Sequence, residues 1–76
     1  MNGNRRKALC EIADKLQELR EDLEFIRDEE QEYMDNMPEN LWNSERYEKA
    51  EEAVDNMDNA LSGIDDAIDF INEAGE

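Results

Sequence analysis

Apolar residues recur at alternating steps of three and four in two long stretches of this chain, and this spacing limits what the chain can fold into. In the second stretch the series is Tyr47, Ala50, Val54, Met57, Leu61, Ile64, Ile68 and Ile71. On an α-helix these residues occupy the a and d positions of a heptad repeat, where side chains pack against a partner helix. The pattern predicts a helix over about 44–74 and gives no sign of a β-strand.

An equivalent series precedes the only proline of the chain. Its members are Leu9, Ile12, Leu16, Leu19, Leu23, Ile26, Glu30, Tyr33 and Met37. Pro38 disfavours helical backbone at the residue before it, so the first helix is predicted over about 5–36. Asn2 or Asn4 is expected to cap this helix, because a side-chain oxygen at that place accepts from a first-turn N–H group.

The connector, residues 37–43, leaves room for one helical turn that Pro38 starts. Asn43 or Ser44 is then expected to cap the second helix. At the other end of that helix, Gly75 stands where a left-handed C-terminal cap is expected. Two long helices joined by so short a connector lie antiparallel.

We therefore predict a single all-α domain, residues 1–76, folded as an antiparallel two-helix coiled-coil hairpin. Matching the two stripes gives the layers Ile12–Ile71, Leu16–Ile68, Leu19–Ile64, Leu23–Leu61, Ile26–Met57, Glu30–Val54 and Tyr33–Ala50. The same register sets Arg20 beside Asp65 and Arg27 beside Asp58, and the basic N-terminal start beside the acidic C-terminal end. Exposed ion pairs add little stability, so these pairs are expected to select the register.

Charge is the most extreme feature of the composition. The chain has 23 acidic residues against 8 basic ones, for a net charge of −15. This balance argues against direct binding of nucleic acid or of an anionic membrane surface, and favours either a basic partner protein or an ordinary solvated surface. No apolar run suits a signal peptide or a membrane span, and the lone Cys10 fits a reducing compartment, so a cytoplasmic protein is expected.

No catalytic, cofactor or metal site is expected. The chain has no histidine, and a single cysteine cannot build a zinc site. Paired acids such as Asp65 and Asp66 have no cleft to work in, because a two-helix hairpin is too narrow to enclose a substrate. A non-enzymatic protein is therefore predicted.

A single seam between two helices makes a thin core, and a second copy of the chain would thicken it. The second helix carries a row of small residues beside its a/d stripe, and the expected oligomer interface is Ala53, Ala60, Gly63, Ala67, Phe70 and Ala74. This row predicts a homodimer that forms a four-helix bundle. The simpler alternative is that alanine is merely a good helix former.

The second helix has no basic residue after Lys49, whereas nine acids follow it. Asp55, Asp66 and Asp69 fall at b and f positions, away from the a/d stripe, and are predicted to contact a basic host protein. Rows of carboxylates on a rigid helix can imitate the charge of a nucleic acid. The alternative is that these acids only keep the protein soluble.

Three other residues stand out. Phe25 is the apolar member of an otherwise acidic c column and is a candidate partner contact, or an isolated surface residue. Trp42 lies in an aromatic and methionine-rich connector that either binds a partner or closes the end of the hairpin. Glu30 interrupts the first a/d stripe, either to select the register or to reach out to water.

The segment from Asp28 to Ala53 reads DEEQEYMDNMPENLWNSERYEKAEEA. It resembles part of a group of short acidic helical proteins of phages and mobile elements of Gram-positive gut bacteria. The most distinctive pieces are residues 35–41 and 44–47, and the likeness covers the middle third of the chain. The resemblance brings no activity and no functional residues. It implies a phage accessory protein that acts on a component of the host.

Two functions from different classes follow from these observations. The first is an inhibitory or adaptor protein that binds a basic host protein, with an acidic surface that mimics nucleic acid against a defence system. The second is a structural module that assembles with itself as a helical bundle or scaffold. A weaker third is a small-molecule sponge with its pocket between subunits.

Overall fold

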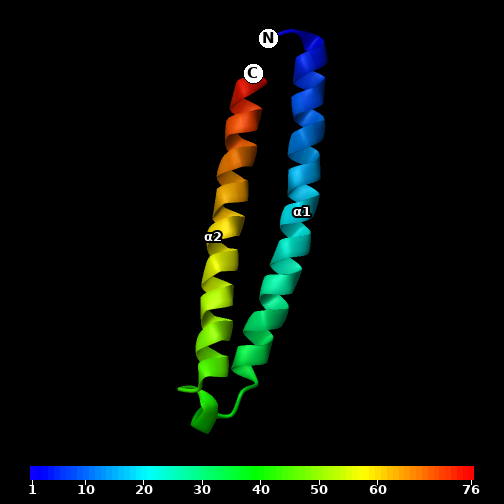
Figure 1. Cartoon of the computed structure of the whole chain (residues 1–76). Coiled ribbons are helices and arrows are strands. Elements are labelled where there is room, and N and C mark those ends of the chain that lie inside the picture. The colour runs from blue at the N-terminus through cyan, green and yellow to red at the C-terminus, as the bar shows by residue number, and fades with distance from the viewer.

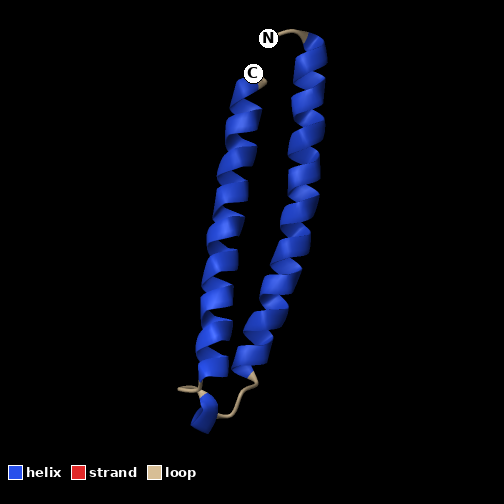
Figure 2. Cartoon of the chain, in the orientation of Figure 1, coloured by secondary structure: helices blue, strands red, loops and turns tan.

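The computed structural model describes residues 1–76, which form two long antiparallel helices (Figure 1). Helix α1 spans Gly3–Asp35 and helix α2 spans Glu45–Ala74. The connector between them contains one short 3₁₀ helix, η1, over Glu39–Leu41. No strand is present (Figure 2), and the molecule is a rod of 59 × 15 × 12 Å with both termini at one end. The predicted all-α helical hairpin is confirmed.

Local side-chain chemistry sets where each helix begins. The side-chain oxygen of Asn2 accepts a hydrogen bond from the backbone N–H of Arg5 at 2.8 Å, so Asn2 is the cap of α1. Ser44 plays the same part for α2, where its hydroxyl oxygen accepts from the N–H of Tyr47 at 3.2 Å. The expectation for Gly75 is wrong, because its φ of −85° lies in the right-handed region. The last turn of α2 closes there through ordinary backbone bonds.

The buried core is small and entirely apolar. Its members are Ala13, Met34, Met37, Ala50, Val54 and Leu61. Met34, Ala50 and Val54 pack into one cluster with Tyr47 against it, close to the connector. Towards the open end of the hairpin, Leu61 and Ala13 are buried singly, outside that cluster, and most other contacts are made by half-buried residues. The hairpin therefore holds its two helices together most firmly near the turn.

Helix α1 does not present its predicted stripe to α2. The d residues of α1 are exposed, at 46% for Ile12, 58% for Leu19, 54% for Ile26 and 44% for Tyr33. The e residues Ala13 and Met34 are buried instead. The expected burial of alternate layers, those that pair Ile12, Leu19, Ile26 and Tyr33 with α2, is therefore wrong. The four exposed residues are called the d column below.

A substitution at Leu61 tests the packing of α2 against α1, which is called the seam. Leu61 is an a residue of α2 and is 7% exposed, so Leu61→Ala is expected to lower the free energy of unfolding by about 2–3 kcal/mol. Urea unfolding followed by far-ultraviolet circular dichroism, at one fixed protein concentration, measures the loss. Glu21→Ala, on the exposed outer side of α1, serves as the control and is expected to change stability by less than about 0.5 kcal/mol. Equal effects of the two substitutions would contradict the seam.

Candidate protein-binding surface

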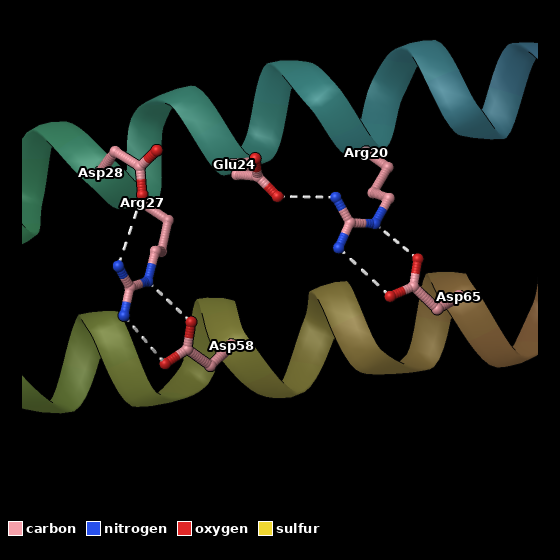
Figure 3. Close-up of polar contacts among 6 residues, drawn as sticks. All are labelled: Arg20, Glu24, Arg27, Asp28, Asp58 and Asp65. Carbon is pink, nitrogen blue, oxygen red and sulfur yellow. Dashed lines mark hydrogen bonds and ion pairs between the residues drawn. The ribbon is translucent and has the colours of Figure 1, made fainter.

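Two arginine–aspartate pairs join the helices at mid-length (Figure 3). Arg27 donates from Nε to Asp58 Oδ1 at 2.7 Å and from Nη2 to Oδ2 at 3.4 Å. Arg20 donates in the same way to both carboxylate oxygens of Asp65, with Nη2 to Oδ2 at 3.2 Å. These are the pairs that the register predicted. Each is a planar fork on a carboxylate, which fixes orientation more tightly than a single contact does.

Each guanidinium group uses all three of its nitrogens in hydrogen bonds within the hairpin. Arg20 also donates to Glu24 at 2.6 Å, and Arg27 to Asp28 at 3.4 Å. The hydrogen bond to Asp65 raises the pKa of Arg20 well above its ordinary value, and the bond to Asp58 raises that of Arg27. A surface hollow of about 360 Å³ lies between the two pairs. Because its cations are already neutralised by four carboxylates, this hollow is no anion site.

The expected pairing of the basic N-terminal start with the acidic C-terminal end is wrong. None of Arg5, Arg6 and Lys7 makes an ion pair. The register of the Arg20–Asp65 pair explains this result. Eleven residues from that pair towards the open end, Leu9 of the first helix lies level with Glu76. A side-chain carbon of Leu9 lies 4.0 Å from where a Cβ on Gly75 would stand. The three basic residues therefore extend beyond the end of α2.

Most acids of α2 are left free. Of the nine that follow Lys49, only Asp58 and Asp65 contact a base. The other seven are exposed and make no ion pair: Glu51, Glu52, Asp55, Asp66, Asp69, Glu73 and Glu76. Six of them occupy the adjacent b and f positions, on the side of α2 away from its a/d stripe. These six, Glu52, Asp55, Asp66, Asp69, Glu73 and Glu76, are called the acidic stripe.

The sequence-predicted residues Asp55, Asp66 and Asp69 thus lie together on one exposed face of one helix. The neutral residues Asn59 and Ser62 interrupt that face at mid-helix. A carboxylate row on a helix of 30 residues is rigidly spaced, because the backbone bonds of α2 hold every side-chain origin in place. Such a row attracts a cationic surface over distances of about 10 Å, the screening length at 0.1 M salt.

The two aromatic candidates lie elsewhere. Phe25 is 67% exposed in the middle of α1. Trp42 is in the connector, where its indole N–H donates to the carbonyl of Met37 at 2.9 Å and its ring stacks on Tyr47 with centroids 6.3 Å apart. Trp42 is therefore part of the closure of the hairpin end, although 45% of it remains exposed. The structure does not gather these aromatics with the acidic stripe into one site.

Sequence reasoning missed the surface formed by the d column. Its signal was present, because Ile12, Leu19, Ile26 and Tyr33 are seven residues apart, but the spacing was assigned to the internal seam. It also missed Arg46, which with Tyr33, Met37 and Leu41 lines a hollow of about 320 Å³ beside the connector. No local sequence pattern places Arg46 against that hollow.

Other site types find no support in the structure. No group of three or more histidine, cysteine, aspartate or glutamate side chains is arranged to hold a metal ion. Neither helix combines the length and the apolar character that crossing a bilayer requires. No family model, no curated protein and no solved structure matches this chain. The candidate surfaces therefore rest on geometry and charge.

The contribution of the two-oxygen contact between Arg27 and Asp58 can be tested with a substitution that keeps the positive charge. Arg27→Lys keeps the positive charge, but one ammonium group cannot span both oxygens of Asp58, so the thermal unfolding midpoint is expected to fall. The fall should be smaller in 500 mM than in 20 mM NaCl, because salt weakens the wild-type ion pair that the variant impairs. Arg6→Lys, at an exposed arginine without an ion pair, is the matched control. If both variants melt alike, the fork contributes nothing to stability.

Proposed function

We propose that the protein is a non-enzymatic accessory protein that binds a basic partner protein through the acidic stripe of α2. The observation that carries the proposal is the set of seven exposed acids in α2 and its C-terminal end that no base of the hairpin neutralises. A structural helix usually mixes charge signs along its exposed side, since oppositely charged neighbours support the helix. Unbalanced charge instead favours rapid association with an oppositely charged surface.

The partner class that fits this surface is a protein that handles nucleic acid. Neighbouring acids of the stripe are three or four residues apart at each of its ends, which is about 4.5–6 Å along the axis of α2. A rod with such a row presents the same sign of charge as a phosphate backbone, so it competes for the same basic groove. Inhibition of the partner follows from that competition.

The biological setting is part of the proposal. The resemblance of residues 28–53 to short acidic proteins of phages and mobile elements supports a role against a host component, such as a defence protein. The single free and exposed Cys10 suits the reducing cytoplasm in which such an encounter takes place. Both features support the proposal in addition to the free acids of α2.

A second candidate function is structural, namely a helical bundle that assembles with itself as a scaffold. One observation favours it: the d column leaves four large apolar side chains in contact with solvent along α1. A basic partner has no use for that surface. The two candidates therefore concern different faces and can be tested separately.

The triple variant Asp55→Lys, Asp66→Lys, Asp69→Lys tests the first candidate. All three residues are exposed and lie away from the a/d stripe, so the helical circular dichroism signal is expected to persist. Affinity pull-down from host lysate with the wild-type protein, at 50 and 500 mM NaCl, should capture a basic protein at low salt and release it at high salt. The triple variant should capture none of it, and duplex DNA should compete with the wild type.

Three reversals on α1, Asp14→Lys, Glu21→Lys and Glu32→Lys, provide the matched control. They change the net charge by the same amount at exposed positions outside the stripe. We expect this control to retain the partner. If both triple variants lose the partner equally, net charge alone explains the binding and the acidic stripe is not the site. If the α2 variant still binds the partner fully, the proposed function is wrong.

A further inference from the structure

The d column is a regularly repeated apolar row on one side of α1 rather than a set of scattered surface residues. Its four members are one heptad apart, so they stand above one another along α1 for three heptads. Isolated apolar side chains on a surface need no explanation, but several large ones repeated on one side of a helix are typical of an interaction site. Phe25, 67% exposed, is the neighbour of Ile26 in the chain.

Helix α2 contributes a second, neutral surface beside its a/d stripe. Between residues 53 and 74 every c, d and g position is uncharged: Ala53, Asn56, Met57, Ala60, Gly63, Ile64, Ala67, Phe70, Ile71 and Ala74. This occurs in a chain of which 41% of the residues are charged. The nine acids after Lys49 occupy b, e and f positions only. A surface kept free of charge in this way does not suit the basic partner of the acidic stripe.

Both surfaces lie on the same side of the hairpin. In an antiparallel pair the e positions of the two helices meet along one edge, and the g positions meet along the other. Here the e edge is closed by the Arg20–Asp65 and Arg27–Asp58 pairs (Figure 3). The d column of α1 and the g alanines of α2 therefore border the opposite, open edge, and the charged g residues of α1, Lys15, Asp22 and Glu29, flank the d column on its outer side.

Gly63 lies within the neutral surface, and no contact inside the hairpin requires a glycine at this position. A Cβ at this position would meet no atom within 4 Å. Glycine in the interior of a helix lowers stability relative to alanine, so its presence is explained better by an external group that comes close to the backbone. The occupant of the surface is thus expected to approach α2 as well as α1.

We infer that this occupant is a second copy of the chain, related to the first by a two-fold axis parallel to the helices. Such an axis leaves every residue at its own level along the rod. The Arg20–Asp65 and Arg27–Asp58 pairs set those levels. Each d-column residue then faces, to within one residue, a g alanine of the second copy; the facing pairs are Ile12 with Ala74, Leu19 with Ala67, Ile26 with Ala60, and Tyr33 with Ala53.

Size and charge both favour this occupant and this axis. A column of large side chains meets a column of methyl groups with the same period and length, which allows interdigitation. The arrangement also places each α2 beside an α1 of the other copy, which repels it less than a second α2 would, because α1 has six basic and eleven acidic residues whereas α2 has two and ten. An axis perpendicular to the helices would set the two acidic α2 helices side by side, where they repel.

The size of the surface suits a small dimer interface. It is about 30 Å long, at ~1.5 Å per residue over the 22 residues from Ala53 to Ala74, and the hairpin is 15 Å across. Roughly 450 Å² per copy, or about 900 Å² in total, lies below the range of standard interfaces and corresponds to a weakly associating dimer. The acidic stripes of the two copies face away from each other, so this inference is independent of the function proposed for the stripe.

Ala60→Glu tests the dimer. Ala60 is exposed in the hairpin, so the variant keeps the fold, but it puts a carboxylate into the middle of the apolar surface. Sedimentation equilibrium at 5–100 µM protein (roughly the range where such interfaces associate) should give twice the monomer mass for the wild type and the monomer mass for Ala60→Glu. Asn59→Glu adds the same charge one residue away, outside the surface, and should stay dimeric. A monomeric wild type, or a dimeric Ala60→Glu, would overturn the inference.

Disulfide formation tests the axis without destabilising the fold. Two single variants, Leu19→Cys and Ala67→Cys, are made in a Cys10→Ser background, mixed, unfolded in urea and refolded together in a glutathione redox buffer. Mass spectrometry of the non-reduced product should show mainly the mixed disulfide between the two variants. A dimer that forms no excess of the mixed disulfide would overturn the parallel axis. The control mixture of Glu21→Cys and Asp69→Cys, both on outward faces, should form none.

Discussion

Two forked ion pairs govern how this hairpin is put together. Arg20 and Arg27 occupy e positions of α1, and they donate hydrogen bonds to both carboxylate oxygens of Asp65 and Asp58, respectively. The e edge of α1 therefore lies against α2. With that edge turned inward, the e residue Met34 is buried and the d column turns outward. The pairs thus select the register of the helices, and together with the burial of Ala13 and Met34 they fix the rotation of α1 about its own axis.

That rotation leaves the hairpin with a thin core and two chemically distinct outer faces. Only six residues are buried, all of them apolar, and those that cluster lie near the connector. On the side of α2 that faces away from α1, acids gather without partners. Along the open edge, large apolar side chains of α1 lie opposite the methyl groups of α2, with the charged residues Lys15, Asp22 and Glu29 of α1 beside them. Segregation of charge by heptad position makes two independent interactions possible on a rod only 15 Å across.

The candidate surface could be predicted in part. Heptad position alone indicated that Asp55, Asp66 and Asp69 are exposed, because b and f residues point away from any single partner helix. The fate of Trp42 could not be read in this way. Adjacent residues of a connector follow no helical period, and its indole N–H finds the carbonyl of Met37 only once the turn has formed. The exposure of the d column was missed for a similar reason, since two e residues of α1, Ala13 and Met34, are also apolar and take the buried places that the d residues were expected to fill.

The sequence by itself determined the elements of this protein and their order. Asn2, Pro38 and Ser44 act on neighbouring backbone groups, so the helix ends are encoded locally. Charges at matching heptad positions also determined which parts of the helices meet. The tertiary structure alone decided which face of α1 turns inward. That choice depends on two interactions between the helices: the hydrogen bonds of two guanidinium groups to aspartates of α2, and the packing of side chains such as Met34 against α2. Both involve residues far apart in the sequence, so no local stretch of the chain encodes them.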